Sequence, residues 1–219
     1  MTTQQEIIYP ETDGQPMAEN TKQFECITTL KGNLDRIFLH DPNVFVAGDL
    51  FWYPVEGRPD IRQAPDVMVV FGRPKGHRRC YLQWQEENIP PQVVFEIASP
   101  SNRPEEWEQK FLFYEEYGVE EYYIYDPETS RWQGWIRRDS KLTPIHSMVG
   151  WVSPRLGVRF GEANSTNMGL TAPDDTPFLS FTELAQMAFQ ERLAREEAEQ
   201  HARRLAQRLR ELGVNPDEL

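Results

Sequence analysis

Residues 90–127 read PPQVVFEIASPSNRPEEWEQKFLFYEEYGVEEYYIYDP and contain the pattern that decides the fold. The run at 93–99 is apolar and rich in β-prone residues, and two prolines precede it. The segment 104–118 predicts a helix, because Pro104 suits the first turn and Gly118 suits the C-terminal end. Residues 120–126 form another strand-like run that ends before Pro127.

Further elements are predicted on both sides of this stretch. Residues 18–38 predict a helix, because apolar residues recur there at intervals of three and four. Residues 44–55 predict one or two strands, and 66–72, DVMVVFG, predict a short strand covered on both faces. A hairpin is expected within 131–148, and another strand at 156–160. A helix, several strands, a helix and a strand in this order predict an α/β fold with a mixed central sheet flanked by helices.

The chain of 219 residues is expected to hold one domain with an appendage. We place the domain at 1–178 and the appendage at 179–219. Residues 180–212 contain no Gly or Pro, and they predict an amphipathic or coiled-coil helix. The helical stripe that supports this comprises Ala194, Ala198, Ala202, Leu205, Leu209 and Leu212.

Charge and composition narrow the function classes. A formal net charge of −12 argues against a broadly basic surface for nucleic acid but leaves room for a local basic site. The loop 73–79, RPKGHRR, could contact phosphates or could simply offset an acidic surface. No apolar run reaches 18 residues, so no membrane span is expected. The N-terminus does not look like a secretory signal, and Cys26 and Cys80 suit free thiols, so we expect a cytoplasmic protein.

Two carboxylates stand inside or beside the apolar strand patterns, and their negative charge needs a compensating group. Asp66 begins one strand and Glu96 lies within the other. Burying two acids together requires an arginine, a shared proton or a divalent cation to compensate their charge. Mg²⁺ prefers such carboxylates together with water and main-chain oxygen, and it supports phosphodiester hydrolysis. Lys110, on the helix that follows, could stabilise developing negative charge, with Tyr114 on the same helical face.

The combined pattern of APDVMVV, VVFEIASPSNR and EEWEQKFLFYEEYGVEEYYIYDP resembles the Uma-type restriction endonuclease family over roughly residues 15–180. This bacterial family belongs to the PD-(D/E)XK nuclease superfamily. The resemblance implies a restriction-endonuclease-like αβββαβ core and a Mg²⁺-dependent or Mn²⁺-dependent endonuclease that cleaves DNA. Together with the amphipathic helix at 180–212, it predicts a homodimer.

Carried over residue by residue, the resemblance assigns the motif aspartate to Asp66 and the motif acid to Glu96. It implies the backbone carbonyl of Ile97 as a further metal ligand and Glu19 as an assisting acid from the N-terminal helix. The strict motif has lysine where this chain has Ala98, and the family's helix lysine corresponds to Lys110.

Two other functions stay open at this point. The departure at Ala98 and the net charge favour a degenerate nuclease fold that serves as an interaction module and self-associates through its C-terminal helix. The same metal site could also hydrolyse a small phosphate ester.

Overall fold

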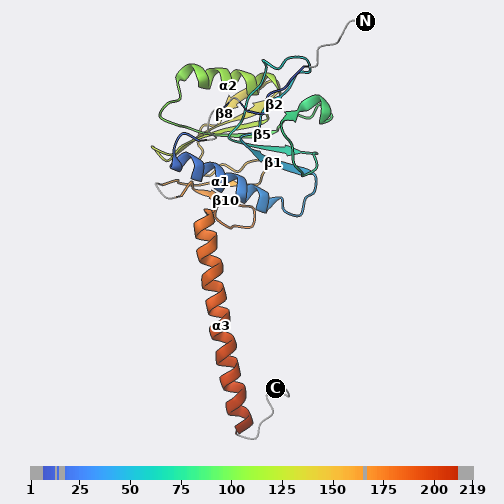
Figure 1. Ribbon diagram of the computed structural model, residues 1–219. Coiled ribbons are helices and arrows are strands. Elements are labelled where there is room, and N and C mark those ends of the chain that lie inside the picture. The colour runs from blue at the N-terminus through green and yellow to red at the C-terminus, as the bar shows by residue number, and fades with distance from the viewer. Residues whose placement is uncertain (1–6, 13, 15–17, 165–166, 212–219) are drawn as a thin grey trace, which may run out of the picture. The chain divides into compact units, whose positions relative to one another are not determined.

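The computed structural model of this chain describes residues 7–12, 14, 18–164 and 167–211. The chain divides into two compact units, one ending at Phe178 and the other beginning at Leu179. The first unit is built on a six-stranded sheet, with helices on both of its faces (Figure 1).

The central sheet is mixed, as predicted. Its strands are, in spatial order, β1 (Val44–Gly48), β3 (Val67–Phe71), β5 (Val93–Ile97), β6 (Glu121–Asp126), β7 (Arg131–Arg138) and β8 (Lys141–Pro144). Strands β5 and β6 are parallel and every other neighbouring pair is antiparallel. A parallel pair needs a crossover connection, and the helix after β5 provides it.

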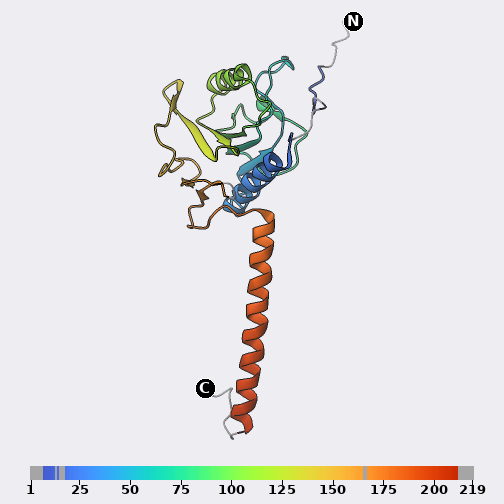
Figure 2. The same cartoon turned by 90° about the vertical axis from the view of Figure 1, so that its left-hand side faces the viewer.

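Helix α1 (Thr21–Ile37) covers one face of the sheet through Ile27, Leu30 and Leu34, which are buried. The helix begins three residues later than the periodicity predicts, because the Asn20 side chain caps it by accepting the Gln23 N–H. Figures 1 and 2 show α1 and α2 (Pro104–Glu116) on opposite sides of the sheet.

Helix α2 covers the other face, where its Tyr114 is fully buried beside Val94 and Tyr122 of the sheet. Pro104 opens the helix, as predicted. Gly118 follows its end with φ +95°, a conformation that favours glycine, and this ends the helix before β6. The αβββαβ order expected of the superfamily is therefore present as α1, β1, β3, β5, α2 and β6.

Shorter elements extend this core. Strands β2 (Trp52–Tyr53) and β4 (Tyr81–Leu82) pair in parallel, and a 3₁₀ turn, η1 (Gln83–Gln85), follows β4. Strands β9 (Arg159–Phe160) and β10 (Leu170–Thr171) pair antiparallel. The predicted hairpin is formed by β7 and β8, with Arg138 opposite Lys141 at its tip.

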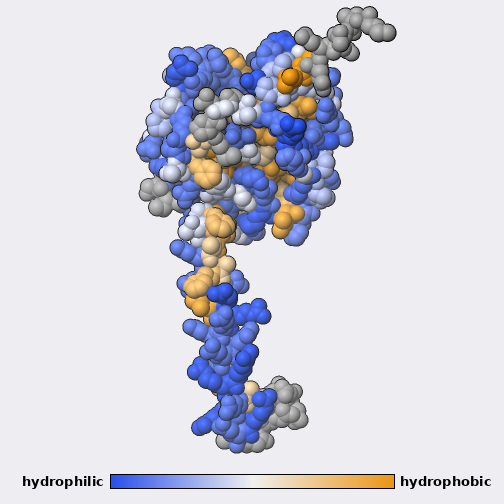
Figure 3. Space-filling model, in the orientation of Figure 1, coloured by the Kyte–Doolittle hydropathy of each residue, from blue (hydrophilic) through white to orange (hydrophobic). Residues whose placement is uncertain are grey.

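The second unit contains one long helix, α3 (Phe181–Glu211). Ser180 and Glu183 form a reciprocal cap at its start, since each side chain accepts the backbone N–H of the other residue. None of the described residues of α3 is buried, and hydrophobic side chains gather on its first turns (Figure 3). Leu212, the last residue of the predicted stripe, lies outside the described residues. In the described part of the chain, no helix has the length and apolarity that crossing a membrane requires.

Candidate active site

The antiparallel register of β3 and β5 brings Asp66 and Glu96 together. Val67 lies opposite Phe95, so Asp66, one residue before, lies opposite Glu96, one residue after. Directly opposed residues of an antiparallel pair point to the same face of the sheet. The two carboxylates therefore lie on one side, which is the side covered by α2.

Glu96 is held by two side chains from α2. The carboxylate is 1% exposed, and its Oε2 lies 2.6 Å from Lys110 Nζ. The Tyr114 hydroxyl donates to Glu96 Oε1 at 2.5 Å. Lys110 and Tyr114 can reach the same carboxylate because residues four apart lie on one side of a helix. The helix thus compensates the Glu96 charge inside the protein.

Burial and the nearby charges shift the pKa values of Asp66 and Lys110. The pKa of Asp66 is raised well above its ordinary value of 3.8, first by burial and then by the negative charge of Glu96. Burial lowers the pKa of Lys110, but the charges of Glu96 and Asp66 outweigh it and leave the pKa raised. Lys110 therefore carries its positive charge at neutral pH.

Ile97, at the end of β5, links this site to α1. Its N–H donates to Asp66 Oδ2 at 2.6 Å, and its carbonyl accepts from Gln23 Nε2 at 3.3 Å. Gln23 comes from the first turns of α1, on the other face of the sheet. The carbonyl that the family resemblance implies as a metal ligand therefore faces the N-terminal end of α1.

Glu19 lies just before α1 rather than on it, which corrects the expectation of an acid from the N-terminal helix. The helix starts at Thr21 because Asn20 caps it. The Glu19 carboxylate accepts hydrogen bonds from the hydroxyls of Ser101 and Ser99, and these bonds lower its pKa. Glu19 thus reaches the end of β5 through the serines that follow Ala98.

A cavity of about 340 Å³ joins these groups. Glu19, Asp66 and Lys110, predicted from the sequence, all line it, whereas Glu96 lies buried beneath. The full lining consists of residues from four separate stretches of the chain: Ala18, Glu19, Gln23, Asp49, Phe51, Arg62, Gln63, Ala64, Asp66 and Lys110.

Four polar residues of this cavity were missed by the sequence reasoning: Gln23, Asp49, Arg62 and Gln63. Gln23 follows Glu19 by four residues, and that spacing is the only local signal that could have found it. Asp49 has φ +47°, and its N–H donates to the carbonyls of Pro65 and Asp66. Its charge adds to the raised pKa of Asp66.

Arg62 brings a second positive charge to the cavity. Its guanidinium lies 5.0 Å from the centre of the Phe51 ring, and Nη1 donates to the Pro59 carbonyl at 2.8 Å. Among the described residues, no carboxylate forms an ion pair with Arg62. No local pattern in the sequence singles out this residue, because its place depends on the pairing of Gln63 with Trp52.

The donor set fits a hard divalent cation. Mg²⁺ in proteins commonly takes one or two carboxylates together with waters and substrate phosphate. Asp66, Glu96 and the Ile97 carbonyl are oxygen donors of this kind, and each carboxylate oxygen keeps a second lone pair. Across the described ranges, no group of three or more His, Cys, Asp and Glu side chains is arranged to hold a metal.

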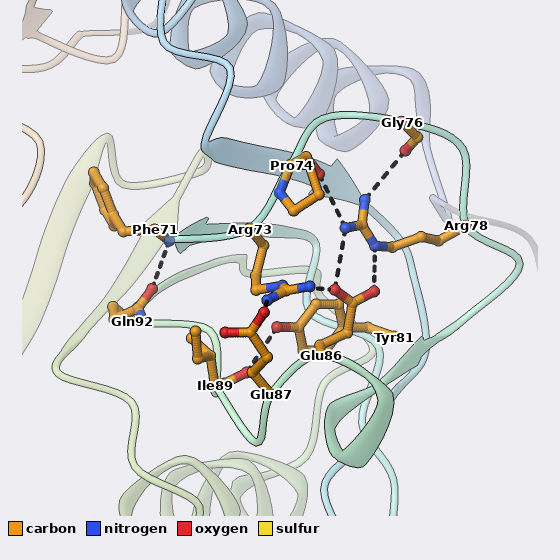
Figure 4. A network of polar contacts seen from close by, with 10 residues as sticks. All are labelled: Phe71, Arg73, Pro74, Gly76, Arg78, Tyr81, Glu86, Glu87, Ile89 and Gln92. Atoms are coloured by element: carbon orange, nitrogen blue, oxygen red, sulfur yellow. Dashed lines mark hydrogen bonds and ion pairs between the residues drawn. The ribbon is translucent and has the colours of Figure 1, made fainter.

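The basic loop at 73–79 is largely engaged in ion pairs (Figure 4). Glu86 accepts from Arg73 at 2.8 Å and from Arg78 at 2.6 Å, and both arginine side chains are about one-eighth exposed, at 12% and 13%. Arg73 also pairs with Glu87, and Arg79 pairs with Glu11. Arg73 and Arg78 are therefore held by Glu86 within the loop, whereas the Arg79 side chain stays 75% exposed.

Comparison with known proteins identifies the family. The model of the family described as Uma2, "Putative restriction endonuclease", matches residues 5–161. The chain belongs to the Uma2 family. A crystal structure described as that of a putative nuclease belonging to DUF820, from Anabaena variabilis, is similar over 66% of this chain and 79% of that chain. It shares 15% sequence identity, with a TM-score of 0.46. No curated protein matches.

Membership of this family, which is described as putative restriction endonucleases, confirms the resemblance. The αβββαβ core that the resemblance implies is present in the structure. In this member of the Uma2 family, a lysine from another element takes the place of the motif lysine that is missing at Ala98. Lys110 reaches the Glu96 carboxylate from α2, so an ammonium group lies beside the acid although β5 itself carries no lysine.

Proposed function

We propose that this protein is an endonuclease that hydrolyses phosphodiester bonds in DNA and depends on Mg²⁺ or Mn²⁺. The observation that carries the proposal is the distance of 2.6 Å between Lys110 Nζ on α2 and Glu96 on β5. The register of β5 against β3 sets this Glu96 opposite Asp66. A carboxylate pair with an adjacent ammonium group is what metal-assisted phosphodiester hydrolysis requires.

In this proposal, different residues of the site bind the metal ion and stabilise charge on the phosphate. Asp66, Glu96 and the Ile97 carbonyl would hold the cation, and Gln23 orients that carbonyl by its hydrogen bond. The chemistry expected from a bound Mg²⁺ or Mn²⁺ is Lewis-acid activation of the phosphodiester and of the attacking water. Lys110 keeps its proton and stabilises negative charge that develops on the phosphate. Glu19, at the rim of the cavity, assists as a hydrogen-bond acceptor.

Arg62 suits the binding of the substrate. It lines the cavity beside Lys110 and has no carboxylate partner among the described residues, whereas the arginines at 73 and 78 are engaged by Glu86. We expect Arg62 to contact a phosphate. Arg62→Gln should weaken DNA binding in Ca²⁺, and it should reduce the slope of log affinity against log salt by about one.

The direct test incubates the purified chain with plasmid and linear DNA in Mg²⁺ or Mn²⁺, with chelator as the control. We expect cleavage that requires metal and that falls at least about a hundredfold in Asp66→Asn and in Glu96→Gln. Glu108→Gln is a matched control, because Glu108 is an exposed residue of α2 and lies outside the cavity lining.

A second function is favoured by two observations, Ala98 just after β5 and the exposed surface of α3. In that case the chain is an interaction module that self-associates through α3. It would cleave no nucleic acid in either metal, whatever the sequence of the substrate. Hydrolysis of nucleotides without cleavage of polymers would instead support a phosphate-ester hydrolase at the same site.

A further inference from the structure

Helix α3 has an unequal distribution of charge along its length. From Phe181 to Glu199 it carries five glutamates and two arginines, and from Gln200 to Glu211 it carries four arginines and one glutamate. Its first part is therefore negative and its second part positive. Two copies of such a helix attract each other when they run antiparallel and repel when they run parallel.

The same helix has a seam with coiled-coil spacing that is apolar at six of its eight positions. The positions follow one another at alternating intervals of four and three residues, and the apolar ones are Leu184, Ala188, Ala198, Ala202, Leu205 and Leu209. Glu191 and Arg195 occupy the two seam positions between Ala188 and Ala198. Leu184 and Leu205 are 39% and 53% exposed. Since most helical stability in proteins comes from packing, a helix of 31 residues with no buried residue has a face to cover.

We propose that α3 pairs with α3 of a second copy in an antiparallel coiled coil. In the register that sets Arg195 opposite Ala198 of the second copy, Leu184 lies opposite Leu209 and Ala188 lies opposite Leu205. Leucine side chains then pack against the second copy at both ends of the paired region. The alanines near its middle allow the two helices to approach closely. The arrangement is two-fold symmetric, so both copies use the same surface.

The two charged seam residues select this orientation. In a parallel pair identical seam positions meet, so Glu191 would lie against Glu191 and Arg195 against Arg195. In the antiparallel pair Glu191 lies opposite Ala202 and Arg195 opposite Ala198. Opposing like charges in a seam is unfavourable, whereas a small partner leaves room for a long side chain to reach water.

The positions beside the seam agree with the same orientation. In the antiparallel register Arg192 comes next to Glu199 of the second copy, and Glu199 next to Arg192. These cross-helix ion pairs would add to the pairs within each helix, such as Arg195 with Glu199 at 3.1 Å. The parallel register offers no such pair there, because Met187 and Ala194 would face Arg192 and Glu199.

The test measures self-association of the full-length chain by sedimentation equilibrium at micromolar concentration. We expect twice the monomer mass. Ala202→Glu places a charge opposite Glu191 of the second copy, so it should raise the dimer dissociation constant about tenfold or more. Gln200→Glu is the matched control, since it adds the same charge two residues away and off the seam, and it should leave the dimer intact. A monomeric wild-type chain overturns the proposal.

Cysteine cross-linking tests the orientation. A mixture of Leu184→Cys and Leu209→Cys proteins should form a mixed cross-link, while Leu184→Cys alone should form no more than the wild type with its native cysteines. Efficient cross-linking of Leu184→Cys to itself would instead establish a parallel pair and overturn the proposal. Neither measurement depends on nuclease activity, so this inference and the proposed function can fail separately.

Discussion

Lys110 Nζ on α2 lies 2.6 Å from Oε2 of Glu96, which is almost completely buried on β5. Burying both partners costs desolvation energy, so the pair persists because each compensates the other and because Tyr114 satisfies the second carboxylate oxygen. The pair joins the crossover helix to the strand that it follows, at the wall of a cavity that also contains Asp66.

Removing the ammonium group should destabilise the fold as well as abolish activity. Lys110→Met leaves Glu96 buried without a cation, so we expect the free energy of unfolding to fall by about 3 kcal/mol. Lys110→Met with Glu96→Gln should recover part of this loss, because the uncompensated charge is gone. Urea titration measures both. Lys141→Met, at an exposed ion pair with Glu115, should have little effect, and an equal loss there would contradict the argument.

Asp66→Asn should stabilise the metal-free protein at neutral pH. The folded chain holds the Asp66 proton more tightly than the unfolded chain, because the pKa is raised. The wild type therefore loses stability as the pH rises from 3.8 through the raised folded pKa, and the variant lacks this contribution. Thermal melts of both proteins from pH 4 to pH 8 measure the difference. Added Mg²⁺ should raise the melting temperature of the wild type more than that of Asp66→Asn.

Tyr114 and Tyr122 are both buried near Glu96, but loss of the hydroxyl should lower the stability of the protein only at Tyr114. Tyr114→Phe removes a donor to a buried carboxylate, and should cost about 2 kcal/mol of stability together with part of the activity. Tyr122→Phe is the matched control, because within the described residues the Tyr122 hydroxyl has no hydrogen-bond partner. That variant should be as stable as the wild type or more so. Equal losses in the two variants would argue against a specific role for Tyr114.

Glu86→Gln should weaken the loop that carries the arginines. Burial raises the pKa of Glu86, but hydrogen bonds and charges from Arg78 and Arg73 outweigh it, so the pKa is lowered from 4.5. The ionised carboxylate thus contributes stability above pH 4.5 that is lost as the pH falls through the folded pKa. We expect a loss of about 2 kcal/mol in Glu86→Gln at pH 7, which shrinks on acidification. A difference that is constant with pH would contradict an ionic role.

Much of the architecture follows from local patterns along the chain. The apolar runs at 66–72 and 93–99, Pro104 at the start of α2 and Gly118 after its end predict the strands and the crossover helix. They do so because strand burial and helix termination depend on nearby residues. Asp66 and Glu96 stand out for the same reason, since a carboxylate in or beside an apolar strand needs a compensating group.

The assembly of the site was decided only in three dimensions. Alternation along a strand tells which residues share a face, but the register of β3 against β5 sets Asp66 opposite Glu96, and it comes from packing over the whole sheet. Gln23 and Arg62 enter the cavity from segments far apart in the chain. Glu86 lies eight residues after Arg78 and engages it, so a loop that reads as basic in the sequence is paired in the fold. These contacts are long-range, and no local propensity encodes them.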